Sequence, residues 1–305
     1  MEHALMPHDA PSTWTPIRLS NALSWPEKTG KQIRHVASWI VLAVRHRGRP
    51  PAFIAWPDLP SRRSVLHKLC GELGWELTNQ PRKSIVGIMR FEDATEKFTP
   101  LPAWLLAIDL PILNQHCVDI RKQTLEQHHV TAFGYGMRVD PLTHQGNLVI
   151  KSDTNAQHDG RIVKGPLALD QVVDTHVYQR LIRNQDQTGR WLDLRVVWIH
   201  GVVSTLYLKF KHEHERFTNQ TASVQLADVT DFISTVEIQN ITKLMVLHQT
   251  ESAELDVLRD ADDGRIYVVD LNPTPWGPPI QLEPAQAQKA IASMSEKLNQ
   301  AVAHR

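Results

Sequence analysis

Three oxygen-bearing side chains near the C-terminal end have the types and spacing of a metal site. Asp256, Asp270 and Asn272 lie near the outer ends of two apolar-rich runs, which are separated by a polar turn closed by Gly264. This pattern predicts a β-hairpin. Residues two apart in a strand point to the same face, so Asp270 and Asn272 share a side, and Asp256 joins them if even positions pair with even positions.

Carboxylate and amide oxygens that converge in this way suit Mg²⁺, which takes a few protein oxygens together with substrate phosphates. The alternative for the hairpin alone is a solvated turn region whose polar side chains face water.

A lysine and a polar loop offer a matching site for phosphate. Lys151 ends an apolar run at residues 148–150 and leads into a polar segment that ends at Gly160. A lysine at a strand end can reach phosphate oxygens while the backbone N–H groups of the loop cover them. Taken alone, this pattern is more often an ordinary exposed lysine at the end of a strand.

Further charged residues lie on predicted strands and in one loop. Asp193 and Arg195 share a face of one strand, and Lys209 and Lys211 share a face of the next. A structural ion pair and a solvated strand edge are the alternatives for these two pairs. The loop that follows supplies a guanidinium and an amide, those of Arg216 and Asn219.

Composition limits the class of protein. A length of 305 residues suggests about two domains, and 42% apolar content is enough for packed cores. Basic and acidic residues number 33 each, so a generally basic nucleic-acid surface is not expected. The longest apolar run is far shorter than the ~20 residues of a membrane span, and no signal peptide is recognised at the N-terminus. With two cysteines no disulfide framework is implied, and a cytoplasmic location is expected.

The sixteen histidines do not predict a zinc site. The closely spaced pairs, His128 with His129 and His212 with His214, have no longer-range partner of the kind a closed tetrahedral site needs, and no cysteine pair accompanies them.

The order of elements predicts two units. Apolar runs at residues 52–55 and 85–91 alternate with a helix at 61–73, and prolines near residues 100–111 mark a boundary. Residues 1–112 are therefore predicted to form a small α/β domain. Residues 113–305 are predicted to be strand-rich, with helices near 119–127, 229–248 and 284–303 and strands at 147–151, 161–164, 176–182, 192–199 and 202–211.

Taken in order, these parts resemble the ATP-grasp superfamily, and within it the carboxylate–amine ligases typified by the ribosomal-protein glutamate ligases. The resemblance covers roughly residues 114–279 and is strongest at 148–151, 193–207 and 256–275. It implies an α+β fold: an ATP-grasp domain, in which two α+β subdomains grip the nucleotide, preceded by the small α/β domain.

The resemblance also implies a role for individual residues. Lys151 matches the lysine that contacts the α- and β-phosphates, and Arg195 matches the arginine beside the transferred phosphoryl group, so both are expected to be catalytic. Asp256, Asp270 and Asn272 match the magnesium ligands. Arg216 and Asn219 are candidates on the acceptor side. The expected nucleotide-binding residues are Lys122, Lys151, Asn155, His158, Gly160, Gln179, Arg180, Leu181, Ile182 and Lys209.

Three departures from the family pattern stand out. The loop after Lys151 has only Gly160, whereas this loop is usually richer in glycine. Arg180 occupies a hinge position where an acidic residue is common. Asp270 stands where glutamate is more frequent. Separately from these departures, Arg121 is an alternative to Lys122 as the first nucleotide-binding cation.

The implied function is an ATP- and Mg²⁺-dependent ligase. It would join a carboxylate to an amine through an acyl phosphate and release ADP and phosphate. A kinase that phosphorylates a hydroxyl and an ATP-binding module without turnover remain as alternatives. The expected partners are ATP and a small-molecule or peptide carboxylate and amine, without nucleic acid or membrane, and a homodimer is left open.

Overall fold

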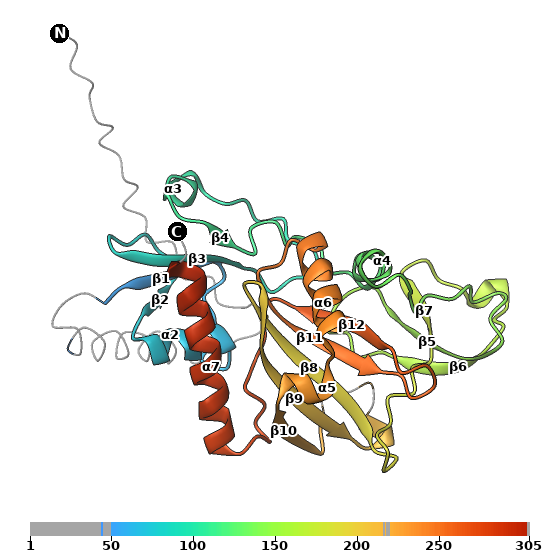
Figure 1. Cartoon of the computed structure of the whole chain (residues 1–305). Coiled ribbons are helices and arrows are strands. Elements are labelled where there is room, and N and C mark those ends of the chain that lie inside the picture. The colour runs from blue at the N-terminus through green and yellow to red at the C-terminus, as the bar shows by residue number, and fades with distance from the viewer. Residues whose placement is uncertain (1–43, 45–49, 216, 218–219, 304–305) are drawn as a thin grey trace, which may run out of the picture.

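The computed structural model describes residue 44, residues 50–215, residue 217 and residues 220–303. Within these residues the strands form three sheets. In Figure 1 the sheet formed by residues 52–113 lies at the left, the one formed by residues 191–272 in the middle and the one formed by residues 146–180 at the right. The α+β class expected from the sequence is confirmed. Arg216 and Asn219, the acceptor-side candidates, lie outside the described residues.

The first sheet is parallel and belongs to the N-terminal unit. Its strands are β1 (Ala52–Pro57), β2 (Glu76–Thr78), β3 (Ile85–Phe91) and β4 (Ile112–Leu113), in the spatial order β2-β1-β3-β4. Helix α2 (Val65–Leu73) connects β1 to β2, and the short helix α3 (Ala103–Leu106) precedes β4. The C-cap Gly74 has a φ of 71°, a left-handed conformation that ends α2 where the sequence predicts a stop.

The second sheet is small and antiparallel. Strand β5 (Gly146–Ser152) lies between β6 (Arg161–Gly165) and β7 (His176–Arg180). It follows helix α4 (Lys122–Phe133), which begins later than the sequence suggests and ends at Gly134 in a left-handed conformation. Helix α4 packs against α6 (Thr235–Leu247) and β12 (Ile266–Asn272), so it connects the second sheet to the third.

The third sheet carries most of the candidate site. Its strands are β8 (Trp191–Ile199), β9 (Val202–Lys211), β10 (Ser223–Ala227), β11 (Ser252–Arg259) and β12 (Ile266–Asn272), in the antiparallel order β10-β9-β8-β11-β12. Alternate residues such as Leu194, Leu206 and Leu255 are fully buried against α4 and α6. The opposite face, termed the site face, carries Arg195, Asp256 and Asp270.

The predicted helix at residues 229–248 is two helices, so that prediction was wrong in its extent. Helix α5 (Val229–Phe232) ends before Ser234, and α6 (Thr235–Leu247) begins after it. The Ser234 side chain accepts a hydrogen bond from the Glu237 N–H, and the Glu237 side chain accepts one from the Ser234 N–H. This capping box fixes a new helix start inside a run whose apolar periodicity looks continuous.

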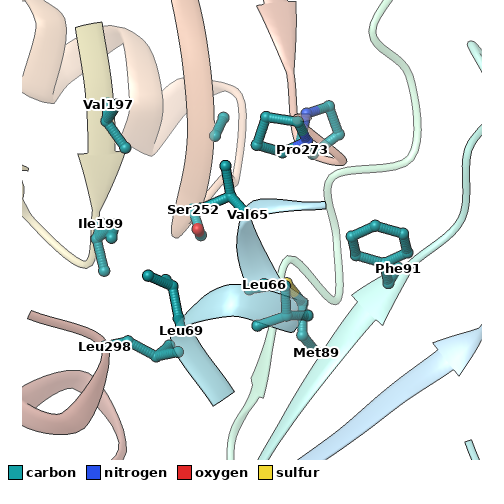
Figure 2. A pocket seen from close by; sticks show the side chains of 12 residues that line it. Val65, Leu66, Leu69, Met89, Phe91, Val197, Ile199, Ser252, Pro273 and Leu298 are labelled. Atoms are coloured by element: carbon teal, nitrogen blue, oxygen red, sulfur yellow. The ribbon is translucent and has the colours of Figure 1, made fainter. Parts of the chain in front are cut away.

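Helix α7 (Pro284–Ala303) lies between the N-terminal unit and the third sheet (Figure 1). Its buried residues Ala290, Met294, Leu298 and Ala301 follow a helical spacing and face α2 and β9. Leu298 belongs to one core together with residues of β1, β3, β8 and β9. Figure 2 shows the small apolar cavity beside it, where Val65, Leu69 and Leu298 approach Val197 and Ile199.

Among the helices that the structure describes, none is both long enough and apolar enough to pass through a membrane.

Replacing Leu298 by Ala tests whether α7 holds the N-terminal unit against the third sheet. The side chain is 1% exposed and already borders a cavity, so its loss enlarges a void that the neighbours cannot fill. We expect the free energy of unfolding to fall by about 2–5 kcal/mol in denaturant titration. The exposed neighbour provides the control: Asn299→Ala should leave it nearly unchanged, and equal effects of the two substitutions would contradict the packing described here.

Candidate active site

Three ionic side chains form one row across the site face. The strand register places Arg195 on β8 directly opposite Asp256 on β11, and Asp256 directly opposite Asp270 on β12. Directly opposed residues of an antiparallel pair project from the same face, so the three charged groups lie side by side. From Glu254 to Asp256 the register pairs even positions with even positions, as the hairpin prediction requires, and after the shift between Asp256 and Val257 it pairs odd with even.

The neighbouring row adds two more oxygen-bearing groups. Glu254 is paired with Asn272 across β11 and β12, and both lie two residues from the carboxylates of the first row. Asn272 therefore shares the site face with Asp256 and Asp270. Its Oδ1 accepts hydrogen bonds from the Thr274 N–H at 2.9 Å and from the Thr274 hydroxyl at 3.2 Å, which fixes the direction of the amide.

Arg195 grips Asp256 with a forked pair of hydrogen bonds. Its Nε donates to Oδ1 at 2.8 Å and its Nη2 donates to Oδ2 at 3.0 Å, while Nη1 donates to Glu254 Oε2 at 3.2 Å. Burial acts to raise the pKa of Asp256, but the charge of Arg195 outweighs it and leaves that pKa well below its usual range. Asp256 therefore stays ionised at all ordinary pH values.

Asp270 is in the opposite electrostatic situation. Its carboxylate has no hydrogen bond to any side chain or backbone group among the described residues. Burial and the nearby charge of Asp256 raise its pKa, although Lys122 and Lys151 act in the other direction. Two carboxylates on directly opposed strand positions repel each other, and a divalent cation between them would remove that repulsion.

Lys151 reaches the site from the second sheet. Its Nζ donates to the backbone oxygen of Val269 at 3.3 Å. Val269 is an extra residue in β12 that has no partner in β11, because the register shifts between Asp256 and Val257. Such a bulge frees a carbonyl from the ladder. Burial, with the charge of Lys122 next in size, lowers the pKa of Lys151 to about 8.

Lys122 adds a second cation from helix α4. Its Nζ donates to the Thr154 oxygen at 2.8 Å, so it lies beneath the loop that follows Lys151. Burial lowers its pKa, while the charges of Asp270 and Asp153 raise it. Lys122 on α4 and Lys151 on β5 thus both lie within electrostatic range of Asp270.

The cover loop, residues 152–160, is held at several points. The Ser152 N–H and hydroxyl both donate to the Asp159 carboxylate, and the Asn155 N–H donates to Thr95 Oγ1 of the N-terminal unit at 3.0 Å. His158 has a φ of 53°, in the left-handed region that non-glycine residues rarely adopt.

Gly160 packs tightly against the loop between β9 and β10. A Cβ at this position would lie 2.6 Å from the Phe217 ring, so a larger residue would displace that ring. Asn155, His158 and Gly160 therefore form part of one loop that contacts the N-terminal unit at one end and the third sheet's loop at the other. This placement explains how a loop with a single glycine can be ordered.

The four residues predicted to form the hinge, residues 179–182, have separate environments. Gln179 is buried, with its amide 3.5 Å from Glu126 Oε2, and Ile182 packs against Met137 and Tyr267. Leu181 is half-buried. Arg180 forms ion pairs with Asp260 and with Asp263 in the β11–β12 turn.

The Arg180 guanidinium also lies over the Tyr267 ring, 4.9 Å from its centroid. An arginine at this hinge position is thus neutralised by the opposite hairpin. The resulting ion pairs join β7 of the second sheet to the turn of the third.

Lys209 lies on the site face one row from Arg195, opposite Asp193 on β8. It is buried, and burial lowers its pKa while the charge of Asp256 raises it. Its neighbour Lys211 forms an ion pair of 2.9 Å with Asp193. Lys209 is therefore a cation near the carboxylates. It lies on β9, on one side of Arg195 and Asp256, whereas Lys151 contacts β12 on the other side.

Sequence reasoning missed Glu254 and Glu126. Glu254 is two residues from Asp256 in a predicted strand, so parity alone would have placed it on the site face. Glu126 accepts hydrogen bonds from the N–H groups of Met137 and Arg138 at 2.6 and 3.0 Å. No local sequence signal indicates this contact, because it bridges a helix and the chain after it.

Several histidines contact other side chains. Within the part of the chain that the structure describes, no group of three or more His, Cys, Asp or Glu side chains could hold a metal ion. His128 Nδ1 is 2.7 Å from His248 Nδ1, and His129 stacks on Phe133. Burial lowers the pKa of His129 to about 4, so this ring is neutral at pH 7.

The chemistry of the donor set fits magnesium bound with a nucleotide. Asp256, Asp270 and Asn272 offer hard oxygen atoms on one face, too few for a complete protein cage but suitable when phosphates supply further ligands. The unpaired, half-buried Asp270 carboxylate supplies the negative charge that such an ion needs. The two half-buried lysines, Lys122 and Lys151, lie within electrostatic range of Asp270.

No protein-family model matches the sequence, and no curated protein matches it. Among solved structures, the RimK domain protein ATP-grasp from Sphaerobacter thermophilus is 12% identical, with a TM-score of 0.49 over 83% of this chain and 99% of its own. The VanG D-Ala:D-Ser ligase from Enterococcus faecalis is 13% identical, with a TM-score of 0.45 over 63% of this chain and 65% of its own.

The ATP-grasp ligase PsnB, solved with a minimal precursor, is 17% identical, with a TM-score of 0.40 over 60% of this chain. The alignment spans 64% of the length of PsnB. Solved ATP-grasp ligases are thus among the structures to which this chain is similar.

Removing the charge of Asp270 and removing that of Asp256 should change the free energy of unfolding in opposite directions. Because the pKa of Asp270 is raised, its ionised form destabilises the fold above the unfolded value of ~3.9. Asp270→Asn should therefore stabilise the metal-free and nucleotide-free protein at pH 7, and the gain should disappear as the pH falls below that unfolded value.

Asp256→Asn is the matched comparison. Its pKa is lowered, so its ionised form stabilises the fold above the unfolded value and that contribution is lost as the pH falls through the folded value. We expect the free energy of unfolding of this variant to be lower than that of the wild type by about 1–3 kcal/mol at pH 7, which is the contribution of a hydrogen bond between charged groups. Denaturant titration from pH 3 to 8 measures both, and effects of the same sign at pH 7 would contradict the assignment of charges.

Proposed function

We propose that this protein is an ATP- and magnesium-dependent ligase of the ATP-grasp type that joins a carboxylate to an amine. The observation that carries the proposal is the row Arg195–Asp256–Asp270 on one sheet face, with Lys151 and Lys122 presented to Asp270 from the neighbouring unit. This arrangement combines carboxylates for a divalent cation with half-buried cations for a triphosphate.

The chain's own residues divide into two groups in this proposal. Lys151 and Lys122 bind phosphate oxygens and neutralise charge as it spreads during transfer, and Arg195 orients the phosphoryl group beside Asp256. The magnesium ion, held by Asp256, Asp270 and Asn272, would polarise the phosphates that it contacts. Catalysis of this kind depends mainly on position and electrostatics.

Nucleotide binding is assigned to the space between the second and third sheets. The hinge at residues 179–182 would lie along the adenine, because Ile182 already belongs to an apolar cluster with Met137 and Tyr267. The cover loop with Asn155, His158 and Gly160 would enclose the phosphates. Lys209 would contribute a further cation at the side of Arg195.

In this proposal the reaction has two steps, with Arg195 beside the transferred phosphoryl group. A substrate carboxylate attacks the γ-phosphate, forming a C–O–P bond as the bond to ADP breaks, and the product is an acyl phosphate. An amine then attacks the acyl carbon and releases phosphate, giving the amide. A guanidinium beside the phosphoryl group can steady both anionic species.

Asp270→Ala should abolish ATP turnover, because it removes the carboxylate oxygen that has no other partner among the described residues. The fold should persist, as judged by an unfolding midpoint equal to or above that of the wild type. ADP release under a panel of carboxylates and amines is the measurement. Undiminished turnover in this variant, and likewise in Asn272→Ala, would remove the metal assignment.

Hydroxylamine distinguishes a ligase from a kinase. A ligase that forms an acyl phosphate should yield a hydroxamate when hydroxylamine replaces the amine, with one ADP per hydroxamate. A kinase acting on a hydroxyl would release ADP without hydroxamate, and a binding module would bind ATP in calorimetry without acceptor-dependent ADP release.

A further inference from the structure

Glu254 is a buried carboxylate with one unpaired oxygen. Its side chain is 2% exposed, and its Oε2 accepts the hydrogen bond from Arg195 Nη1 at 3.2 Å. Within the part of the chain that the structure describes, Oε1 is buried and has no hydrogen-bond partner. An unpaired buried carboxylate oxygen is costly, and a group that reaches it in another state of the protein would remove that cost.

Two neighbours of Glu254 do not satisfy this oxygen. Lys68 on α2 donates to the Gly277 carbonyl instead. The Tyr207 hydroxyl is itself buried without a partner among the described residues, so no hydrogen bond joins it to Glu254. Gly277 packs closely against the carboxylate, because a Cβ there would lie 3.3 Å from Oε1.

Two cations remain: Lys209, which lies within electrostatic range of Glu254, and Arg195, which already contacts it. The present position of Arg195 conflicts with metal binding. Its fork occupies both oxygens of Asp256, at 2.8 and 3.0 Å. A guanidinium and a divalent cation on one carboxylate repel each other. For Asp256 to serve as a metal ligand at full strength, the fork must loosen its hold.

We propose that the Arg195 guanidinium changes its forked hydrogen-bond partner from Asp256 to Glu254 when a divalent cation binds. This change of partner is called the hand-over below. The guanidinium keeps its contact with Oε2 and gains a second hydrogen bond to Oε1, which makes the pair with Glu254 forked. Glu254 is thus a positioning residue for Arg195, and its unpaired oxygen is the acceptor reserved for the metal-bound state. The inference rests on the proposed metal site.

The geometry makes this exchange short. Glu254 and Asp256 are two residues apart on β11 and point to the same face, so their carboxylates flank one guanidinium. Only the side-chain torsions of Arg195 need to change, and the strand register stays as it is. The exchange leaves Asp256 with free oxygen lone pairs at the moment when a cation needs them.

Binding of Mn²⁺ in the presence of ADP tests the hand-over without turnover. Paramagnetic resonance of free Mn²⁺ gives the affinity directly. In Glu254→Gln, Arg195 loses its alternative charged partner and stays on Asp256, so Mn²⁺ affinity should fall by about tenfold or more. Asp193→Asn is the matched control, since it also removes one carboxylate from the site face but does not contact Arg195, and its loss should be clearly smaller.

A double-mutant cycle separates the hand-over from simple loss of negative charge. In an Arg195→Leu background there is no guanidinium to transfer, so Glu254→Gln should no longer weaken Mn²⁺ binding by the same factor. If Arg195→Leu does not fold, Arg195→Lys serves, because an ammonium cannot form the fork. An equal loss from Glu254→Gln in wild-type and Arg195-substituted protein would overturn the hand-over.

The outcomes also distinguish this inference from the proposed function. Absence of Mn²⁺ and ADP binding in the folded wild-type protein overturns the metal site and the hand-over together. Normal binding in the wild type, with equal effects of Glu254→Gln and Asp193→Asn, overturns the hand-over alone. Denaturant unfolding of each variant, compared with the wild type, establishes that the affinities refer to folded protein.

Discussion

The repulsion between two carboxylates on directly opposed strand positions is the constraint on which the site depends. Asp256 and Asp270 face each other across β11 and β12, an arrangement that is unfavourable in a sheet built only for stability. The protein offsets it by placing Arg195 on one side and Lys122 and Lys151 on the other. The cations balance the pair incompletely, because Asp270 keeps a raised pKa, and this remaining negative charge is what a divalent cation would use.

The rest of the fold holds these charges in place. One face of the third sheet is buried against α4 and α6, which fixes the register and therefore the face to which every charged residue points. On the site face, α2 and α7 cover the end near Val197 and Ile199 and leave the charged end to the second sheet. The bulge at Val269 then provides the carbonyl that receives Lys151. Packing on both faces thus fixes the face to which each strand residue points, and this brings the charged side chains together at the site.

The sequence was sufficient to predict which strand residues share a face and where the hairpin turn lies, but it did not predict the contacts between units. The alternation around Asp256 and the spacing of Asp270 and Asn272 were sufficient to predict their common face. The break at Ser234 was missed, because the apolar pattern of residues 229–248 continues through the capping box. The hydrogen bonds of Arg195 to Asp256 and Glu254 and that of Lys151 to Val269 join residues more than 50 positions apart, and no local pattern encodes them. The division at residue 112 stays a prediction, with α7 packed against both parts.

The most direct test of the central claim is the position of a metal ion in crystals grown with Mn²⁺ and ADP, located by anomalous scattering. We expect a peak on the site face, with oxygen atoms of Asp270, Asn272 and Asp256 at about 2.1 Å and the nucleotide phosphates completing the coordination. A nucleotide bound with its metal ion away from these three residues would contradict the proposed site.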